Sequence, residues 1–284
     1  MPQNKQDIII GPHENLKSAL KDWLLCTDLN PSNEQIIRHL DESPIHRDDL
    51  IKQCAWWVVR RHVGAKSWRV LKKLHRLATP EKYDKYIEVK HYLPNSDTTR
   101  KGNLGEILLC EYLFEITHYI PYVHKLTYNP NVEQSMKGDD VLLFNKTNLQ
   151  TDLIYAESKI RTEPDTYVVP EIVNNLQGNK RFPTSINFVV QVLRNGGQDD
   201  IADAIEEMQL KVMAGSIPVR HVGWLMSCRG KTKSKDVLLR TLNALKIQPN
   251  ANLAFVAVSI DNVQQFVDDV YQRANEIILN GGMI

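Results

Sequence analysis

The amino-acid sequence predicts an α/β fold in which a mixed sheet follows an N-terminal helical region. Residues 141–144 and 153–161 are short runs rich in Val, Ile, Leu, Tyr and Phe, and a polar turn joins them, as is typical of paired strands. Residues 219–228 and 253–260 are two further apolar runs of strand length. Apolar residues at helical spacing lie before, between and after these runs. Strands interleaved with amphipathic helices favour a mixed α/β sheet.

The first 94 residues are predicted to form a helical region that binds a protein partner or DNA. One helical face is expected to carry Leu16, Leu20, Trp23 and Leu24. Ser32 and Gln35 have the spacing of a capping box, which predicts that a helix begins there. A longer helix is expected over residues 48–62, ending at Gly64, and another around Leu71.

The charge of this region is uneven. From Lys52 to Lys101 there are 13 Lys and Arg residues against 4 Asp and Glu, although the net charge of the whole chain is only +1. Such an excess suits the binding of phosphate groups. It is equally the composition of a solvated helical face, so the sequence leaves both interpretations open.

A polar stretch at residues 93–99 is predicted to separate this region from a domain of residues 95–284. The elements expected in that domain, in order, are a helix over 104–114, a strand near 119–128, the strands 141–144 and 153–161, helices over 168–176, 186–193 and 201–213, strands 219–228 and 253–260, and a final helix capped by Asp261.

The second motif strand carries an acid and an amine on one face. Side chains alternate along a strand, so Glu157 and Lys159 share a face while Ser158 and Ile160 share the other. Asp139 and Asp140 lead directly into the first motif strand. Paired carboxylates supply the hard oxygen ligands that Mg²⁺ prefers. A lysine beside them can orient a water molecule and stabilise developing negative charge.

A third acid lies on the helix predicted over residues 104–114. Apolar residues surround nearly its whole circumference, so the helix is expected to be buried. Glu106 lies in its first part, and a buried ionised glutamate is costly unless it is paired or bound to a metal ion. Each of these motifs alone also has a simpler interpretation, as a solvated strand face for Glu157 and Lys159 or as turn residues for Asp139 and Asp140.

The ordered set Glu106, Asp140 and Glu157-Ser158-Lys159 resembles the PD-(D/E)XK nuclease superfamily. The proline of that superfamily's first motif is absent and Asp139 stands in its place, which leaves open whether Asp139 or Asp140 binds metal; Asp140 is favoured because it directly precedes the apolar run. Together with the glycine-containing lead-in to the helix and the Gly-Asp-Asp sequence, the set is similar to the HamA family, the nuclease subunit of the Hachiman anti-phage defence system, over roughly residues 95–284.

This resemblance implies a DNA nuclease that uses Mg²⁺ or Mn²⁺. Asp140, Glu157 and Glu106 would be the metal ligands, and Lys159 would position the nucleophile. The resemblance also implies a helicase-type ATPase partner (HamB-like) that restrains the nuclease until DNA damage or phage infection. The alternative is a non-catalytic DNA-binding or adaptor subunit that keeps a nuclease-like core. A restriction-type enzyme is less favoured, because the sequence has no separate target-recognition region.

Several other classes of function are not supported by the sequence. Its four cysteines are scattered and its nine histidines form no His-x-x-x-His pair, so a zinc site is not expected. Gly230-Lys231-Thr232 follows a strand, but the glycine that a phosphate loop needs five residues earlier is Leu225. No apolar run reaches the length of a membrane span and the N-terminus has no signal-peptide pattern, so a cytoplasmic protein without a membrane partner is expected.

Overall fold

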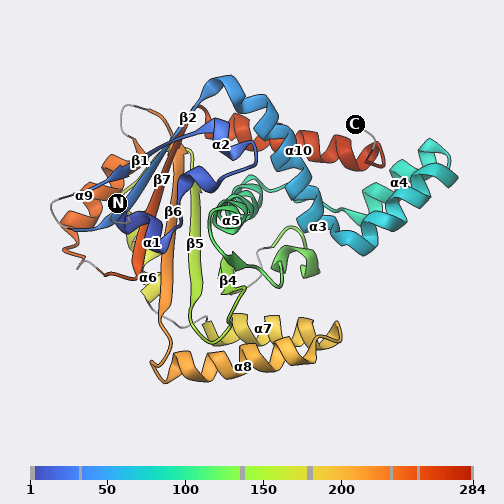
Figure 1. Cartoon of the computed structure of the whole chain (residues 1–284). Coiled ribbons are helices and arrows are strands. Elements are labelled where there is room, and N and C mark those ends of the chain that lie inside the picture. The colour runs from blue at the N-terminus through green and yellow to red at the C-terminus, as the bar shows by residue number, and fades with distance from the viewer. Residues whose placement is uncertain are drawn as a thin grey trace.

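The computed structural model describes residues 4–31, 34–134, 138–177, 182–230, 233–247 and 250–282, and within these ranges a mixed seven-stranded sheet organises the molecule. The strand order is β1-β2-β7-β6-β5-β4-β3 (Figure 1). The strands are β1 (Leu24–Leu29), β2 (Ile36–Glu42), β3 (Tyr119–Ile120), β4 (Val141–Asn145), β5 (Leu153–Arg161), β6 (Val219–Cys228) and β7 (Leu253–Ile260). Strands β2, β7, β6 and β5 run parallel, and β1, β4 and β3 add antiparallel pairs at the two edges. The predicted α/β class and mixed sheet are confirmed.

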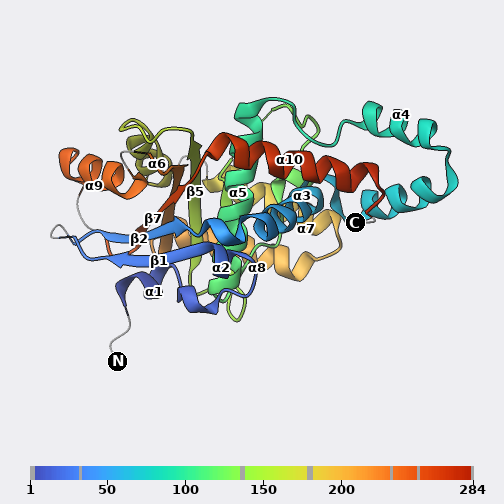
Figure 2. The same cartoon turned by 90° about the horizontal axis from the view of Figure 1, so that it is seen from above.

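Helices cover both faces of the sheet (Figures 1 and 2). On one side α3 (Arg47–Leu77), α5 (Asp97–Ile116) and α10 (Val263–Leu279) enclose the largest apolar core, and on the other side α6 (Val168–Gln177) and α9 (Ser234–Ala244) enclose a second. The hairpin of α7 (Phe182–Asn195) and α8 (Asp199–Met213) packs on the ends of β4 and β5. The shorter helical segments are α1 (Lys5–Ile9), η1 (His13–Asn15), α2 (Leu20–Trp23), η2 (Pro44–His46), α4 (Pro80–Lys90) and η3 (Lys125–Tyr128).

The prediction that the N-terminal region is helical is wrong over two segments. Leu24, which was expected on a helical face, begins β1, and the helix expected from the capping-box pattern is replaced by β2. Ser32 lies outside the described residues, and the Gln35 side chain donates to the Ile247 carbonyl oxygen at 2.7 Å. Strand β2 is buried on both faces, so it lacks the alternation that identifies a half-exposed strand. The predicted division at residue 94 crosses this sheet, because β1 and β2 precede it.

The remaining elements follow the sequence closely. The motif strands, β6, β7 and the helices α6, α7 and α8 are confirmed. The strand expected near 119–128 is reduced to β3, and α9 begins within a basic segment for which no helix was predicted. The final helix is capped by Asn262 instead of Asp261, because the Asn262 side chain accepts a hydrogen bond from the Gln265 amide at 3.1 Å. No helix in the described part of the chain is long and apolar enough to cross a membrane.

Helix α3 bends at Gly64, where the sequence predicted that a helix ends. The backbone there has φ 70° and ψ 157°, a conformation that is almost confined to glycine. A Cβ atom at this position would lie 2.8 Å from Cγ2 of Thr127 in η3. Beyond the bend, the second half of α3 continues with α4 into an arm that projects from the sheet (Figures 1 and 2). Gly64 therefore sets the direction of the arm, and its lack of a side chain allows α3 to lie close to Thr127 of η3.

Replacing Gly64 by alanine is expected to lower the free energy of unfolding by about 1–3 kcal/mol, because both the backbone conformation and the contact with Thr127 become strained. Urea unfolding followed by circular dichroism measures the loss. Gly102→Ala is the matched control, because a Cβ atom added to the helical Gly102 would meet no other atom within 4 Å. Equal stability of the Gly64→Ala variant and the parent would contradict this role of Gly64.

Burial makes His62 a source of acid sensitivity. Burial lowers the pKa of this side chain from 6.5 to about 4, so the unfolded chain binds a proton that the folded chain does not bind. The contribution of His62 to the free energy of unfolding is therefore fully present above about pH 6.5. It falls by up to about 1.4 kcal/mol per pH unit as the pH drops toward 4. His62→Gln should flatten the pH dependence of urea unfolding between pH 7 and 4.5 by about 2–3 kcal/mol. Parallel curves for the two proteins would contradict this.

Candidate active site

Strand β5 places the predicted acid and lysine side by side. Glu157 is fully buried, and its Oε1 atom lies 2.8 Å from Nζ of Lys159. Helix α6 holds both groups: Asn175 donates to Oε1 of Glu157 at 2.6 Å, and Oε1 of Glu171 lies 3.1 Å from Nζ of Lys159. Burial, followed by the nearby Asp140 carboxylate, raises the pKa of Glu157. The Glu-x-Lys motif is therefore a buried ion pair instead of a solvated strand face.

Asp140 lies opposite Glu157, one position beyond the antiparallel pair of Val141 and Ala156. Its Oδ2 atom accepts a hydrogen bond from the Ser158 amide at 2.9 Å. This side-chain hydrogen bond stands where a further backbone hydrogen bond between β4 and β5 would come, and it turns the carboxylate toward β5. Asp140 also interacts electrostatically with both Glu157 and Lys159. The two motif strands thus bring their acids together because of their register.

Helix α5 places Glu106 close enough to Asp140 for the two charges to interact. The helix approaches β5 closely at Gly105, where a Cβ atom would lie 2.5 Å from Oγ of Ser158. Burial raises the pKa of Glu106 to about 8, with the neighbouring Asp140 adding to the rise and Lys125 opposing it. As the sequence predicted, this acid is buried; in the structure it has a charged partner.

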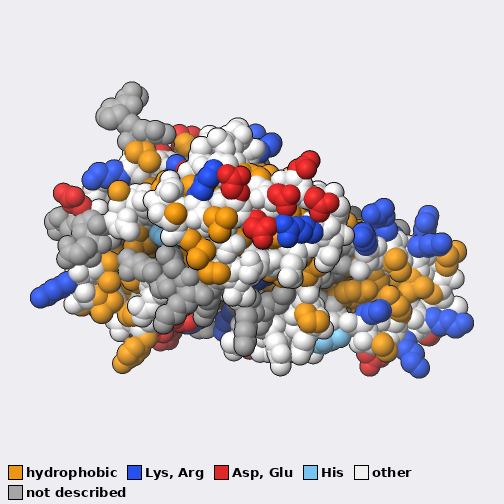
Figure 3. Space-filling model, turned by 90° about the horizontal axis from the view of Figure 1, so that it is seen from below, with side chains coloured by type: hydrophobic (Ala, Val, Ile, Leu, Met, Phe, Trp, Pro, Cys, Tyr) orange, Lys and Arg blue, Asp and Glu red, His pale blue; other side chains and the backbone are white. Residues whose placement is uncertain are grey.

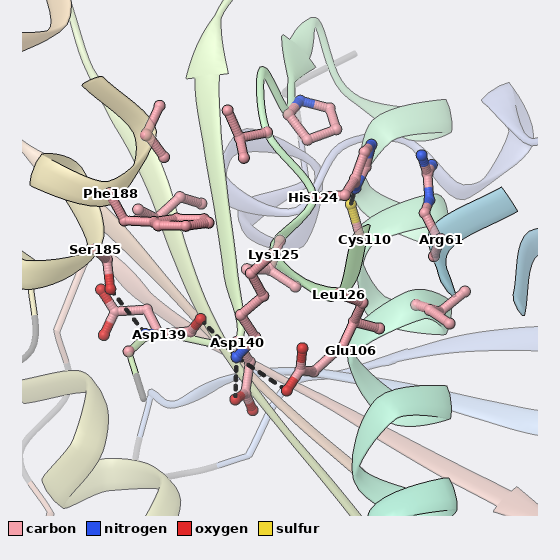
Figure 4. Close-up of a pocket in the computed structure, with 17 residues that line it drawn as sticks. Arg61, Glu106, Cys110, His124, Lys125, Leu126, Asp139, Asp140, Ser185 and Phe188 are labelled. Carbon is pink, nitrogen blue, oxygen red and sulfur yellow. Dashed lines mark hydrogen bonds and ion pairs between the residues drawn. The ribbon is translucent and has the colours of Figure 1, made fainter. Parts of the chain in front are cut away.

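That partner, Lys125, was not identified from the sequence. Its Nζ atom lies 3.0 Å from Oε1 of Glu106, 3.6 Å from Oδ1 of Asp140 and 3.0 Å from the Asp139 carbonyl oxygen (Figure 4). Lys125 begins the short helix η3 in a segment with no regular periodicity. The sequence offered only one signal, a single lysine in a largely apolar and aromatic stretch. The structure shows that this stretch is half-buried.

Asp139 and Asp140 point to different partners. The Tyr155 hydroxyl donates to Oδ1 of Asp139 at 2.5 Å, and the Asp139 amide donates to Oγ of Ser185 on α7 at 2.8 Å. Burial raises the pKa of the Asp139 carboxyl. Its side chain is directed toward Tyr155 and α7, whereas Asp140 contacts Lys125 (Figure 4). This geometry favours Asp140, and not Asp139, as the residue that joins Glu106 and Glu157 in one group of acids, called here the acid cluster.

The acids fit a hard cation chemically, although lysines now partner them. Oε2 of Glu157 and Oδ2 of Asp139 are buried without a hydrogen-bond partner. An unpartnered buried carboxylate oxygen is costly, and a bound cation removes that cost. Within the described residues, no three or more His, Cys, Asp or Glu side chains are already arranged around one metal position.

A cavity of about 70 Å³ adjoins the acid cluster between η3, β4 and α7. Its lining residues include Glu106, Lys125 and Asp140 and the apolar residues Val123, Phe188 and Val189. Figure 4 shows Phe188 on the side away from Glu106. The cavity therefore adjoins Glu106 and Asp140, whereas Glu157 and Lys159 are not among the residues that line it.

The projecting arm carries a basic and partly apolar surface. Figure 3 shows blue basic side chains around orange apolar ones at this end of the molecule. Val70, Leu77 and Val89 are more than half exposed there, among exposed lysines that include Lys73 and Lys85. This surface is more apolar than a purely solvated helical face.

Two comparisons with known proteins identify the family of this chain. The family model described as HamA matches residues 17–274. The Hachiman protein HamA of Bacillus cereus is 31% identical to this chain over 276 residues, which cover 97% of this chain and 97% of that protein. The similarity extends through the N-terminal strands and the arm as well as the acid cluster. This chain therefore belongs to the HamA family.

Proposed function

We propose that this protein is a metal-dependent DNA nuclease effector of a bacterial anti-phage defence system, built on a PD-(D/E)XK-like core. The observation that carries the proposal is the fully buried Glu157, which lies opposite Asp140, is paired with Lys159 and retains one unpartnered carboxylate oxygen. Burying an acid in this way is unfavourable for stability, so a function is the better explanation for its presence.

Asp140, Glu157 and Glu106 would hold a Mg²⁺ or Mn²⁺ ion. When bound, such an ion supplies a water of lowered pKa and neutralises charge that develops on the phosphate. Lys159 orients the attacking water, because Glu157 and Glu171 fix its ammonium group from two sides. Asn175 holds the Glu157 carboxylate in place. The packed surroundings strengthen each of these electrostatic interactions.

The direct test is cleavage of linear, plasmid and single-stranded DNA by the purified protein with Mg²⁺, with Mn²⁺ and with EDTA. Metal-dependent cleavage that is lost in Lys159→Met supports a nuclease. An adaptor subunit would give no cleavage and no Mg²⁺ binding that depends on Asp140. Equal cutting by the parent and Lys159→Met would show that a contaminant or another site is responsible.

The proposal includes a helicase-type ATPase partner that restrains the nuclease. Its support is the similarity to a Hachiman protein, together with basic surfaces that suit the DNA backbone. Contacts to phosphate carry no sequence information, so a nuclease that depends on them cuts host and phage DNA alike. Such an activity needs control from outside the site. DNA integrity and cell survival before and after phage challenge, with and without the partner, test this control; constant cutting by the complex would contradict it.

The arm is the proposed docking surface. Deleting residues 1–94 would remove β1 and β2 from the sheet, so point substitutions are the sharper test. Lys73→Glu with Lys85→Glu reverses two exposed charges on the arm. This double variant is expected to lose co-purification with the ATPase, while Lys211→Glu on α8 retains it. Unchanged co-purification of the arm variant would place the interface elsewhere.

A further inference from the structure

The ammonium group of Lys125 lies where a cation ligated by Glu106 and Asp140 would lie. Two carboxylate oxygens and the Asp139 carbonyl oxygen surround it, at 3.0, 3.6 and 3.0 Å (Figure 4). Carboxylates and backbone carbonyls are the ligands that hard divalent cations take from proteins. The lysine therefore has the ligand set of a metal ion.

The cluster is too enclosed to hold both cations. The side chains of Lys125, Glu106 and Asp140 are 12%, 10% and 13% exposed. Little water is present to screen charges in such a place, so an ammonium group and a divalent ion that share the same two carboxylates repel each other strongly. Binding of one requires that the other leave.

We propose that Lys125 is a resident cation that competes with the metal ion for Glu106 and Asp140 and holds the site in its metal-free form. This inference rests on the metal-dependent activity proposed above. Lys125 is then a positioning residue: it keeps the two acids apart from a metal ion until its ammonium group withdraws.

The segment that carries Lys125 is built so that the ammonium group can withdraw without breaking the sheet. Helix η3 lies outside the strands and is fastened to α3, because the Thr127 hydroxyl donates to the Arg61 carbonyl oxygen at 2.9 Å. It also rests against the bend at Gly64. The neighbouring cavity provides space beside the lysine. The position of Lys125 consequently depends on α3, the helix whose second half forms the arm.

The first test measures Mn²⁺ binding by electron paramagnetic resonance, without DNA. Lys125→Met keeps the apolar stem but removes the charge, and it is expected to bind Mn²⁺ at least about tenfold more tightly than the parent. Lys125→Arg keeps a cation and should bind no more tightly than the parent. Lys211→Met removes an exposed charge from α8 and controls for net charge. Unchanged or weaker binding by Lys125→Met would overturn the proposal.

A second test uses the parent protein, so it does not depend on how a variant folds. Amine acetylation followed by mass spectrometry reports the accessibility of each lysine. Saturating Mn²⁺ is expected to increase the labelling of Lys125 several-fold and to leave that of Lys211 unchanged. Constant or reduced labelling of Lys125 in the presence of Mn²⁺ would contradict its displacement.

These results separate the inference from the proposed function. If the parent binds Mn²⁺ and cleaves DNA but Lys125→Met binds no more tightly, only the competition is refuted. If neither the parent nor Lys125→Met binds Mn²⁺ and neither cleaves DNA, the nuclease proposal fails first and the competition fails with it.

Discussion

Replacing Glu157 by glutamine is expected to reduce metal-dependent DNA cleavage by roughly a hundred- to a thousandfold, the loss typical when one electrostatic group of a preorganised site is removed. Glutamine has nearly the same shape and can still accept the hydrogen bond from Asn175. What it lacks is the negative charge that fixes Lys159 and that would hold a cation in the proposed site. Initial rates of plasmid cleavage measure the effect.

Two controls make this result specific. Glu171→Gln removes the other, half-exposed carboxylate beside Lys159 and is expected to change the rate only a few-fold. Thermal unfolding without metal should show that Glu157→Gln is at least as stable as the parent, because it removes a buried charge whose pKa burial raises. Cleavage by Glu157→Gln at the parental rate would exclude Glu157 from the site.

Replacing Arg38 by methionine is expected to cause the largest loss of stability, about 3–5 kcal/mol. Arg38 is 1% exposed and lies in β2, where its guanidinium group contacts Asp28 at 2.7 and 2.9 Å and Asp7 at 2.7 Å. It also donates to the Gly11 carbonyl oxygen at 2.7 Å. Methionine fills a similar volume but leaves these oxygens without their partner. The N-terminal segment thereby loses the contacts of Asp7 and Gly11 with β2.

Urea unfolding of Arg38→Met and Arg194→Met measures this difference. Arg194 on α7 also contacts two acids, but it is 44% exposed, so its substitution should cost less than about 1 kcal/mol. Adding Asp28→Asn to Arg38→Met should restore part of the stability, because it removes one of the unpaired charges. A loss below about 1 kcal/mol for Arg38→Met would mean that water replaces the guanidinium contacts.

The sequence predicted the two motif strands and the face on which their charged residues lie, because local patterns determine both. Alternation along β5 placed Glu157 and Lys159 on one face, and the polar turn before it fixed the pairing with β4. The apolar circumference of α5 predicted the burial of Glu106. These patterns depend on residues close together in the sequence.

Strand β2, which also supplies the partner of β1, was missed because its inner neighbour in the sheet is distant in the sequence. Strand β2 pairs with β7, more than 200 residues later, and it contains Arg38 and His39 in a fully packed environment. A buried arginine and histidine on a short segment resemble the polar face of a helix until their tertiary partners are known. Contacts with Asp28 and Ser259 explain them in the folded protein.

Lys125 was missed for a related reason. Its role depends on where a short irregular segment lies against two acids, one on α5 and the other directly before β4. No spacing rule relates a lysine in such a segment to those acids. Its assignment required the folded arrangement of three separate parts of the chain.

The most direct measurement of the central claim is anomalous diffraction from crystals of the protein soaked in Mn²⁺. The proposed site predicts an anomalous peak in contact with the carboxylates of Asp140 and Glu157, with Glu106 beside it and the ammonium group of Lys125 moved away. The same soak of Glu157→Gln crystals should give a weaker peak or none. A fully soaked parent crystal with no peak at these carboxylates, or with manganese bound only by other residues, would contradict the account.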